Sequence, residues 1–93
     1  MRKIEQKMVK AVQAGENFRE SNTEVKFDHR SDGVGEVFLH GNRIAEVWLD
    51  GLCIPDTQTL RRWPTRTTCS RLTALGIGAH IFRGDAHIDG ERV

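Results

Sequence analysis

The stretch that decides the fold is VGEVFLH at residues 34–40, GN at 41–42 and RIAEVWL at 43–49. Both longer runs favour β-strands, and a two-residue Gly-Asn connection between such runs is typical of a β-hairpin. Apolar residues recur at every second position, which predicts one buried face and one exposed face. The residues expected on the buried face are Val37, Leu39, Ala45, Val47 and Leu49. The sequence therefore predicts an antiparallel hairpin at the centre of the fold.

Two further strands are expected beside this hairpin. Residues 23–28, TEVKFD, alternate in the manner of a half-buried strand, and residues 29–33 have the composition of a turn. After a second turn at 50–51, residues 52–54 form a short strand. Pro55 ends it, because proline cannot donate a hydrogen bond to a strand ladder. Four strands joined by tight turns predict a mostly antiparallel sheet.

Two helices are predicted from apolar residues at helical spacing. The first spans residues 2–14, with apolar side chains at positions 4, 8, 11 and 12, and Gly15 stands where a helix cap is expected. A shorter helix beginning near Thr67, with a threonine as its cap, would bury the side chains at positions 69, 72 and 75. Residues 16–22 are expected to form a connecting loop, and residues 57–66 are the least regular part of the chain.

A second hairpin is predicted near the end of the chain. Residues 79–83 and 86–88 would form it about Gly84-Asp85, and residues 89–93 are expected to fray. The predicted fold class is α+β: a small, mostly antiparallel sheet with two short helices in the order α-β-β-β-β-α-β-β. A chain of 93 residues that is 38% hydrophobic and 29% charged has room for one small core. We therefore expect a single domain over residues 1–93, with both helices on one side of the sheet.

The composition argues against a membrane partner. No apolar run approaches the roughly 20 residues needed to cross a bilayer. The N-terminal residues MRKIEQ lack the apolar centre of a signal peptide. We expect an intracellular, cytoplasmic protein.

Sequence motifs give little support to catalysis, to a cofactor or to a metal site. The chain contains no nucleophile elbow, zinc-protease motif, phosphate loop or dinucleotide fingerprint. Cys53 and Cys69 belong to no C-x-x-C pair, and the four histidines lack the spacing of metal ligands. We expect two buried free thiols and predict no catalytic residue, metal or cofactor. A small enzyme that uses Cys69 as its nucleophile is a third alternative for the function.

Charge is strongly segregated, although the net charge is only +1. Residues 1–13 carry +3 and residues 14–56 carry −5. Residues 57–83 carry +5 without a single acid, and residues 84–93 carry −2. Local fields of this kind steer association more than the net charge does. The chain therefore offers a partner both an acidic and a basic surface.

The basic part of the chain has the residue types of a phosphate-binding surface. Guanidinium groups grip phosphates, threonine hydroxyls donate to them, and an indole stacks on a base. The structural alternative is that Arg61 and Arg62 pair with acids of the middle segment and that Trp63 is a core residue. The residues expected to form a nucleic-acid-binding surface are Lys3, Lys7, Lys10, Arg61, Arg62, Trp63, Arg66 and Arg71.

Three stretches carry a family resemblance: SNTEV at 21–25, VFLHGNRIA at 37–45 and WPTRTTCSRLTAL at 63–75. In this order they resemble a group of small proteins of tailed bacteriophages. The pattern of that group is S-N-T-x-V, then L-H-G-N-x-I-A, then W-x-T-x-T-T-x-S-R-L-N-A-L. The chain departs from it at Cys69, at Thr73 and at Arg62, where the pattern has glycine. The resemblance implies a phage protein that acts in the cytoplasm of an infected bacterial cell, and it brings no catalytic residue with it.

Small phage proteins commonly bind a host or defence complex stoichiometrically, so the resemblance implies an inhibitor, with anti-CRISPR activity as one case. The partner would meet the acidic strand faces, or the arginine segment would meet an acidic surface, with Trp48 or Trp63 as an aromatic anchor. The residues expected at the acidic interface are Glu24, Asp28, Glu36, Glu46 and Trp48. The structural alternative for Trp48 is packing under a helix. The alternative function is direct binding of nucleic acid or a nucleotide through residues 61–71, and an exposed strand edge allows a homodimer.

Overall fold

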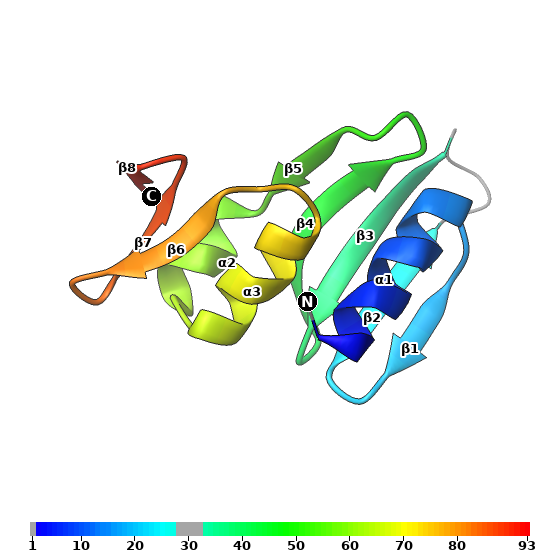
Figure 1. Ribbon diagram of the computed structural model, residues 1–93, viewed down its shortest axis with the longest axis horizontal. Coiled ribbons are helices and arrows are strands. Elements are labelled where there is room, and N and C mark those ends of the chain that lie inside the picture. Colours follow the sequence, from blue (N-terminus) through cyan, green and yellow to red (C-terminus); the bar gives the residue numbers. More distant parts are fainter. Residues whose placement is uncertain (1, 28–32) are drawn as a thin grey trace.

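The fold is α+β, as predicted, but its strands form two antiparallel sheets rather than one (Figure 1). The computed structural model describes residues 2–27 and 33–93. The larger sheet lies beside three helices, and the smaller sheet projects from the opposite end of the molecule. The principal extents are 39 × 24 × 20 Å, so the molecule is elongated along the line that joins the two sheets.

The larger sheet has five strands in their chain order, and every neighbouring pair is antiparallel. Its strands are β1 (Phe18–Glu20), β2 (Thr23–Phe27), β3 (Val34–Leu39), β4 (Asn42–Trp48) and β5 (Cys53–Pro55). The prediction of a loop over residues 16–22 was wrong, because β1 pairs with β2 there. A strand of three residues with one half-buried apolar side chain is too short to show a period, so only its pairing reveals it.

The predicted hairpin is present, with its turn one residue earlier than expected. His40 and Gly41 form the connection, and both have positive φ angles, 52° and 78°. That geometry is typical of the two-residue turns that join antiparallel strands. A register shift between Val37 and Phe38 leaves Ile44 without a partner on β3, so Ile44 and Ala45 are both buried.

The core lies between one face of this sheet and the helices. Val25, Val37, Ala45 and Val47 are fully buried there, and Leu39 is nearly so. The prediction that Leu49 lies on the buried face was wrong, because Leu49 lies in the turn after β4 and is 55% exposed. Since β4 ends at Trp48, the strand period no longer applies to Leu49.

In the described part of the chain, three helices pack against the sheets instead of the predicted two. Helix α1 (Lys3–Ala14) buries Met8 and Ala11 and ends at Gly15, which has a left-handed φ of 68° as a C-cap glycine should. Helix α3 (Arg66–Ala74) is the predicted short helix, with Thr65 as its cap. The irregular stretch 57–66 contains the additional helix α2 (Thr57–Arg62). Its six residues bury only Leu60, which leaves no apolar period to detect.

The smaller sheet contains the second predicted hairpin and one strand more. Strand β6 (Ala79–Phe82) pairs with β7 (Asp85–Ile88), which pairs with β8 (Glu91–Arg92). The tail therefore does not simply fray, because Glu91 and Arg92 pair with Ile88 and His87. Ala79 and Ala86 are buried on the face that packs toward the helices. None of the helices in the described parts of the chain is long and apolar enough to span a membrane.

Candidate functional site

The arginine segment, residues 61–66, joins α2 to α3 and presents three exposed guanidinium groups, those of Arg61, Arg62 and Arg66. Trp63 is the C-cap of α2, and its backbone N–H donates to the carbonyl of Thr59 at 2.9 Å. Its side chain is 47% exposed, so Trp63 is not a core residue. The segment therefore carries one accessible indole and three accessible cations within six consecutive residues.

The arginines of this segment have no acidic partner within residues 2–27 and 33–93. The acid nearest in sequence, Asp56, interacts with other groups. Asp56 caps α2 by accepting from the backbone N–H of Thr59 at 3.0 Å, and its carboxylate also pairs with Arg43 at 3.1 Å. Ion pairs between the segment and the middle acids, the alternative raised by the sequence, are thus not seen in the described structure. The positive charge of the segment is left to attract an external anion.

A cleft of about 360 Å³ opens beside Trp63. Its floor contains the buried side chains of Leu39, Ile44 and Thr68, and the exposed or half-buried side chains of His40, Asn42 and Thr59 also line it. The cleft is therefore built from the β3–β4 turn on one side and from α2 and the start of α3 on the other. Clefts that bind small ligands combine an apolar lining with a few polar groups in this way.

Threonine hydroxyls fix the start of α3 at the edge of the cleft. The Thr65 hydroxyl accepts from the backbone N–H of Thr68 at 3.1 Å and lies 2.8 Å from the Thr68 hydroxyl. The hydroxyls of Thr65 and Thr68 are therefore hydrogen-bonded to each other. Thr67, by contrast, has no side-chain hydrogen bond among the residues that the structure describes, so its hydroxyl remains available to a ligand.

Arg71, expected to contact phosphates, is instead in the interior. Its side chain is 3% exposed and pairs at 2.8 Å with Glu5, whose side chain is equally buried. Arg71 also donates to the Thr23 hydroxyl at 3.1 Å, and the Ser70 hydroxyl donates to Glu5 at 2.6 Å. Burial alone would raise the pKa of Glu5, but the hydrogen bonds from Ser70 and Arg71 outweigh it and the pKa is lowered. Arg71 thus ties α3 to α1 and β2, which removes it from the candidate interface.

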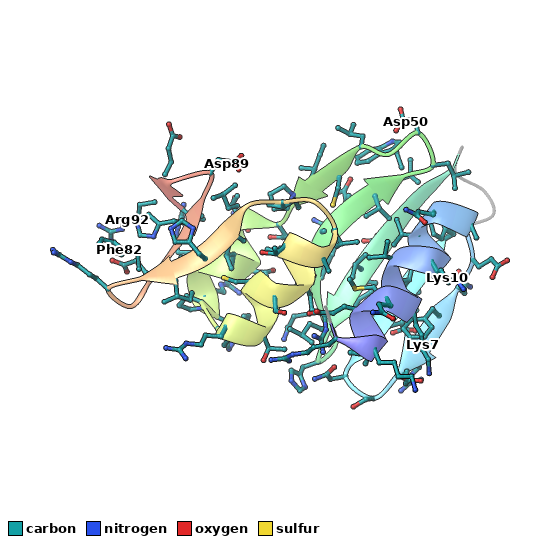
Figure 2. The ribbon with its side chains drawn as sticks, viewed as in Figure 1. Lys7, Lys10, Asp50, Phe82, Asp89 and Arg92 are labelled. Atoms are coloured by element: carbon teal, nitrogen blue, oxygen red, sulfur yellow. The ribbon has the colours of Figure 1, made fainter. Side chains whose placement is uncertain are left out.

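The three lysines of the predicted basic stripe lie on the exposed side of α1. Lys7 pairs with Glu20 at 2.8 Å, while Lys3 and Lys10 have no ion pair in the described parts of the chain. Figure 2 shows Lys7 and Lys10 on α1, away from the helices that carry the arginines. A shallow groove lined by Lys3, Lys7 and Lys10 shares no lining residue with the cleft at Trp63. The lysines therefore form a separate basic surface.

The predicted acidic interface lies on the open face of the larger sheet and is largely neutralised. Arg43 pairs with Glu46 at 2.9 Å and with Glu36 at 3.3 Å. Glu24 lies 3.9 Å from the Lys26 ammonium, which is a weak pair. The pKa of Arg43 is raised by its hydrogen bond to Asp56 and by Glu36 and Glu46, as expected for a cation held among acids. This face is therefore mixed in charge rather than acidic.

Asp28, another member of the predicted acidic interface, lies outside the described residues. Trp48 is half-buried and pairs across the strands with Val34, on the face opposite to the buried Val47. It therefore lies on the open sheet face rather than under a helix.

Both cysteines are free thiols, and Cys69 is buried as predicted, whereas Cys53 is only half-buried. Burial raises the pKa of Cys53 to about 11 and also raises the pKa of Cys69. A raised pKa favours the protonated thiol over the thiolate, which is the reactive form. Within residues 2–27 and 33–93 no three His, Cys, Asp or Glu side chains are grouped closely enough to hold a metal ion.

The three stretches that carried the family resemblance meet at one end of the larger sheet. The backbone N–H of His40 donates to the carbonyl of Asn22 at 2.8 Å, and Arg71 reaches Thr23. His40 and Trp63 both line the cleft. Comparison with protein families finds that the model described as Kyanoviridae Gp96 protein matches residues 1–87. The chain belongs to this family of bacteriophage proteins. The predicted resemblance to phage proteins is thereby confirmed, whereas no curated protein and no solved structure matches the chain.

In this Kyanoviridae Gp96 family member, the matched residues include every element that lines the cleft. Of the residues that line the cleft, the sequence analysis named Trp63 as a binding residue but not His40, Asn42 or Thr59. His40 and Asn42 lie in or next to a two-residue turn, where polar residues are ordinarily interpreted as turn formers. Only the approach of α2 and α3 to that turn makes them part of a site.

Proposed function

We propose that this phage protein acts by stoichiometric binding and that the partner of the arginine segment is nucleic acid. The observation that carries the proposal is the presence of three exposed arginines within three positions of an exposed tryptophan in the chain, with no acid pairing to them in the described residues. Arginine contacts phosphate with two parallel hydrogen bonds, and an indole stacks on any base. The raised pKa values of Cys53 and Cys69 further support binding over nucleophilic chemistry.

An acidic protein surface is the competing partner for the same cations. Protein partners are usually held by a hydrophobic centre with charged groups around it. At the arginine segment the apolar side chains Leu39 and Ile44 lie below the surface as the floor of a cleft. A recessed apolar floor beside a stacking residue favours a ligand with a planar group that can enter it, and this favours nucleic acid.

The proposal is tested by titrating labelled single- and double-stranded DNA and RNA with the protein across a range of salt concentrations. Binding should weaken steeply with salt, because each phosphate contact releases a counterion. Replacing Arg61, Arg62 or Arg66 singly by alanine should reduce the slope of log K against log salt by about 1 for each phosphate that is no longer bound. Arg92→Ala is the matched control, because it removes an exposed arginine on β8. Absence of binding at low salt, or an equal effect of Arg92→Ala, would reject the proposal.

A second candidate is the inhibition of a host or defence protein complex through the open face of the larger sheet. The observation in its favour is an apolar edge: Leu52 and Ile54 are 51% and 48% exposed, and Ile54 lies on the edge strand β5 beside Glu46. Exposed apolar residues on a sheet edge are frequent contact points for other chains.

The inhibitor candidate is tested in bacterial cells that carry a phage-defence system and produce this protein. If the sheet face binds the defence complex, Ile54→Asp should restore the block to phage plating. Arg62→Ala, on another surface, should leave the inhibition intact. Equal phage plating with the wild type and Ile54→Asp would count against the sheet face.

A further inference from the structure

Apolar, aromatic and polar side chains all line the cleft beside Trp63. Leu39 and Ile44, which are 4% and 2% exposed, form an apolar floor. Trp63 supplies an aromatic surface of which nearly half is accessible. Among the residues that the structure describes, the side chains of His40 and Asn42 make no hydrogen bond, so they have donors and acceptors to offer.

We propose that this cleft holds one unpaired nucleotide, with its base stacked on Trp63 and its phosphate toward the arginine segment. The inference rests on the proposed function and specifies the ligand of the same site. A base has an apolar face for the indole and floor, and a polar edge for the His40 ring, the Asn42 amide and the Thr67 hydroxyl. The phosphate finds Arg62 and Arg66 close in sequence to the stacking residue, one on each side of it.

The volume of the cleft and the stacking of bases in a duplex both favour a single strand as the ligand. Its volume of about 360 Å³ is at the small end of the range of about 300–1,000 Å³ found for ligand sites, which suits one nucleotide. In a duplex the base faces are covered by their neighbours, and side chains can reach only the base edges. The protein should therefore bind single-stranded nucleic acid more tightly than the matching duplex.

Fluorescence of Trp63 provides a direct test. The chain has two tryptophans, so Trp48→Phe is the background in which Trp63 reports alone. The probe is a single-stranded oligonucleotide of about ten nucleotides, within the site sizes known for single-strand binders. Saturable quenching by this probe, with weaker quenching by the duplex, is expected. Quenching by inorganic phosphate to the same extent would overturn the proposal, since no base would be needed.

Two substitutions at position 63 separate stacking from any structural effect. Trp63→Ala should weaken binding of the single strand by about 5-fold to 100-fold, as the loss of one base–aromatic stack does, while Trp63→Phe should recover much of it. Because Trp63 is half exposed, neither change should unfold the protein, and circular dichroism checks this. Equal affinities for wild type, Trp63→Ala and Trp63→Phe would overturn the cleft proposal.

The two proposals fail in different ways in these titrations. If binding remains salt-dependent and sensitive to Arg62→Ala but indifferent to Trp63→Ala, the nucleic-acid function stands and the cleft proposal is wrong. If no oligonucleotide binds at low salt, the proposed function itself is wrong. A mononucleotide, used as a second probe, shows whether the bound nucleotide is free or part of a strand. If the mononucleotide quenches Trp63 at a similar concentration, the ligand is a free nucleotide. If only the oligonucleotide quenches Trp63, the ligand is a strand.

Discussion

The ion pair between Arg71 and Glu5 illustrates how a residue type can mislead when only the sequence is considered. An arginine in a basic segment favours a phosphate contact, yet Arg71 is buried and paired with an acid 66 positions away. The sequence around Arg71 does not indicate this pairing, because its partner Glu5 lies on another helix, α1. Arg66, at the start of the same helix, is exposed and stays a candidate for a phosphate contact. Burial, rather than residue type, separates the two roles.

Removing Arg71 should therefore cost stability rather than nucleic-acid affinity. Arg71→Met leaves the Glu5 carboxylate buried without its cation, which should lower the free energy of unfolding by about 3–5 kcal/mol. The double variant Glu5→Leu with Arg71→Met should regain much of the loss, since a buried ion pair can be replaced by apolar groups. Urea unfolding followed by circular dichroism measures both, with Arg66→Ala as the exposed control. An Arg71→Met protein of normal stability and impaired oligonucleotide binding would contradict the placement of Arg71.

The same pair predicts how stability depends on pH. The pKa of Glu5 in the folded protein lies below its ordinary value of 4.5, so the unfolded chain takes up the proton more readily. The stabilising effect is fully present above the unfolded pKa and is lost as the pH falls through the folded pKa. The urea midpoint should therefore fall as the pH is lowered below about 5. Glu5→Gln should show a flatter dependence, and an unchanged profile would contradict the role of Glu5.

At the scale of elements, strands β2 and β3 are joined by a contact that one methyl group would disturb. Gly35 pairs with Phe27 across the strands, and a Cβ added to Gly35 would lie 2.7 Å from the Phe27 ring. Phe27 is 8% exposed, so its ring has little room to move. The glycine is needed here for space, not for an unusual backbone angle.

Gly35→Ala should therefore lower the free energy of unfolding by about 1–3 kcal/mol, which is the usual cost of overpacking a core. The double variant Gly35→Ala with Phe27→Leu should lose less than the sum of the two single changes, because the smaller side chain relieves the overlap. A double-mutant cycle from urea unfolding gives that coupling. Strict additivity would mean that the ring and the new methyl group do not meet.

Most of the elements that the sequence predicted are long enough to show a period, and the short strand β5 was predicted from the turn before it and the proline that ends it. Helix α1, strand β2 and the β3–β4 hairpin each bury several residues at regular spacing. Helix α2 and strands β1 and β8 bury at most one residue each, so they depend on partners distant in the chain. The site divides in the same way: Trp63 and its arginines stand out by composition, whereas His40 and Asn42 join them only through tertiary packing.

At the scale of the whole molecule, the two candidate surfaces are carried by different parts of the fold and differ in charge. The arginine segment lies on α2 and α3, whereas the open sheet face mixes Arg43 with Glu24, Glu36 and Glu46. A change confined to one surface can therefore discriminate between the two functions.

Glu24→Lys makes that discrimination. Glu24 has only the weak 3.9 Å contact with Lys26, so reversing its charge should leave the fold intact. If nucleic acid binds at the arginine segment, affinity for a single-stranded oligonucleotide should be unchanged or slightly raised, because the whole molecule becomes more positive. If the sheet face inhibits a defence complex, the same variant should lose its effect on phage plating. Glu91→Lys, an equal charge reversal on the remote strand β8, is the control for net charge. A marked gain of oligonucleotide affinity by Glu24→Lys but not by Glu91→Lys would move the nucleic-acid surface from the arginine segment to the sheet.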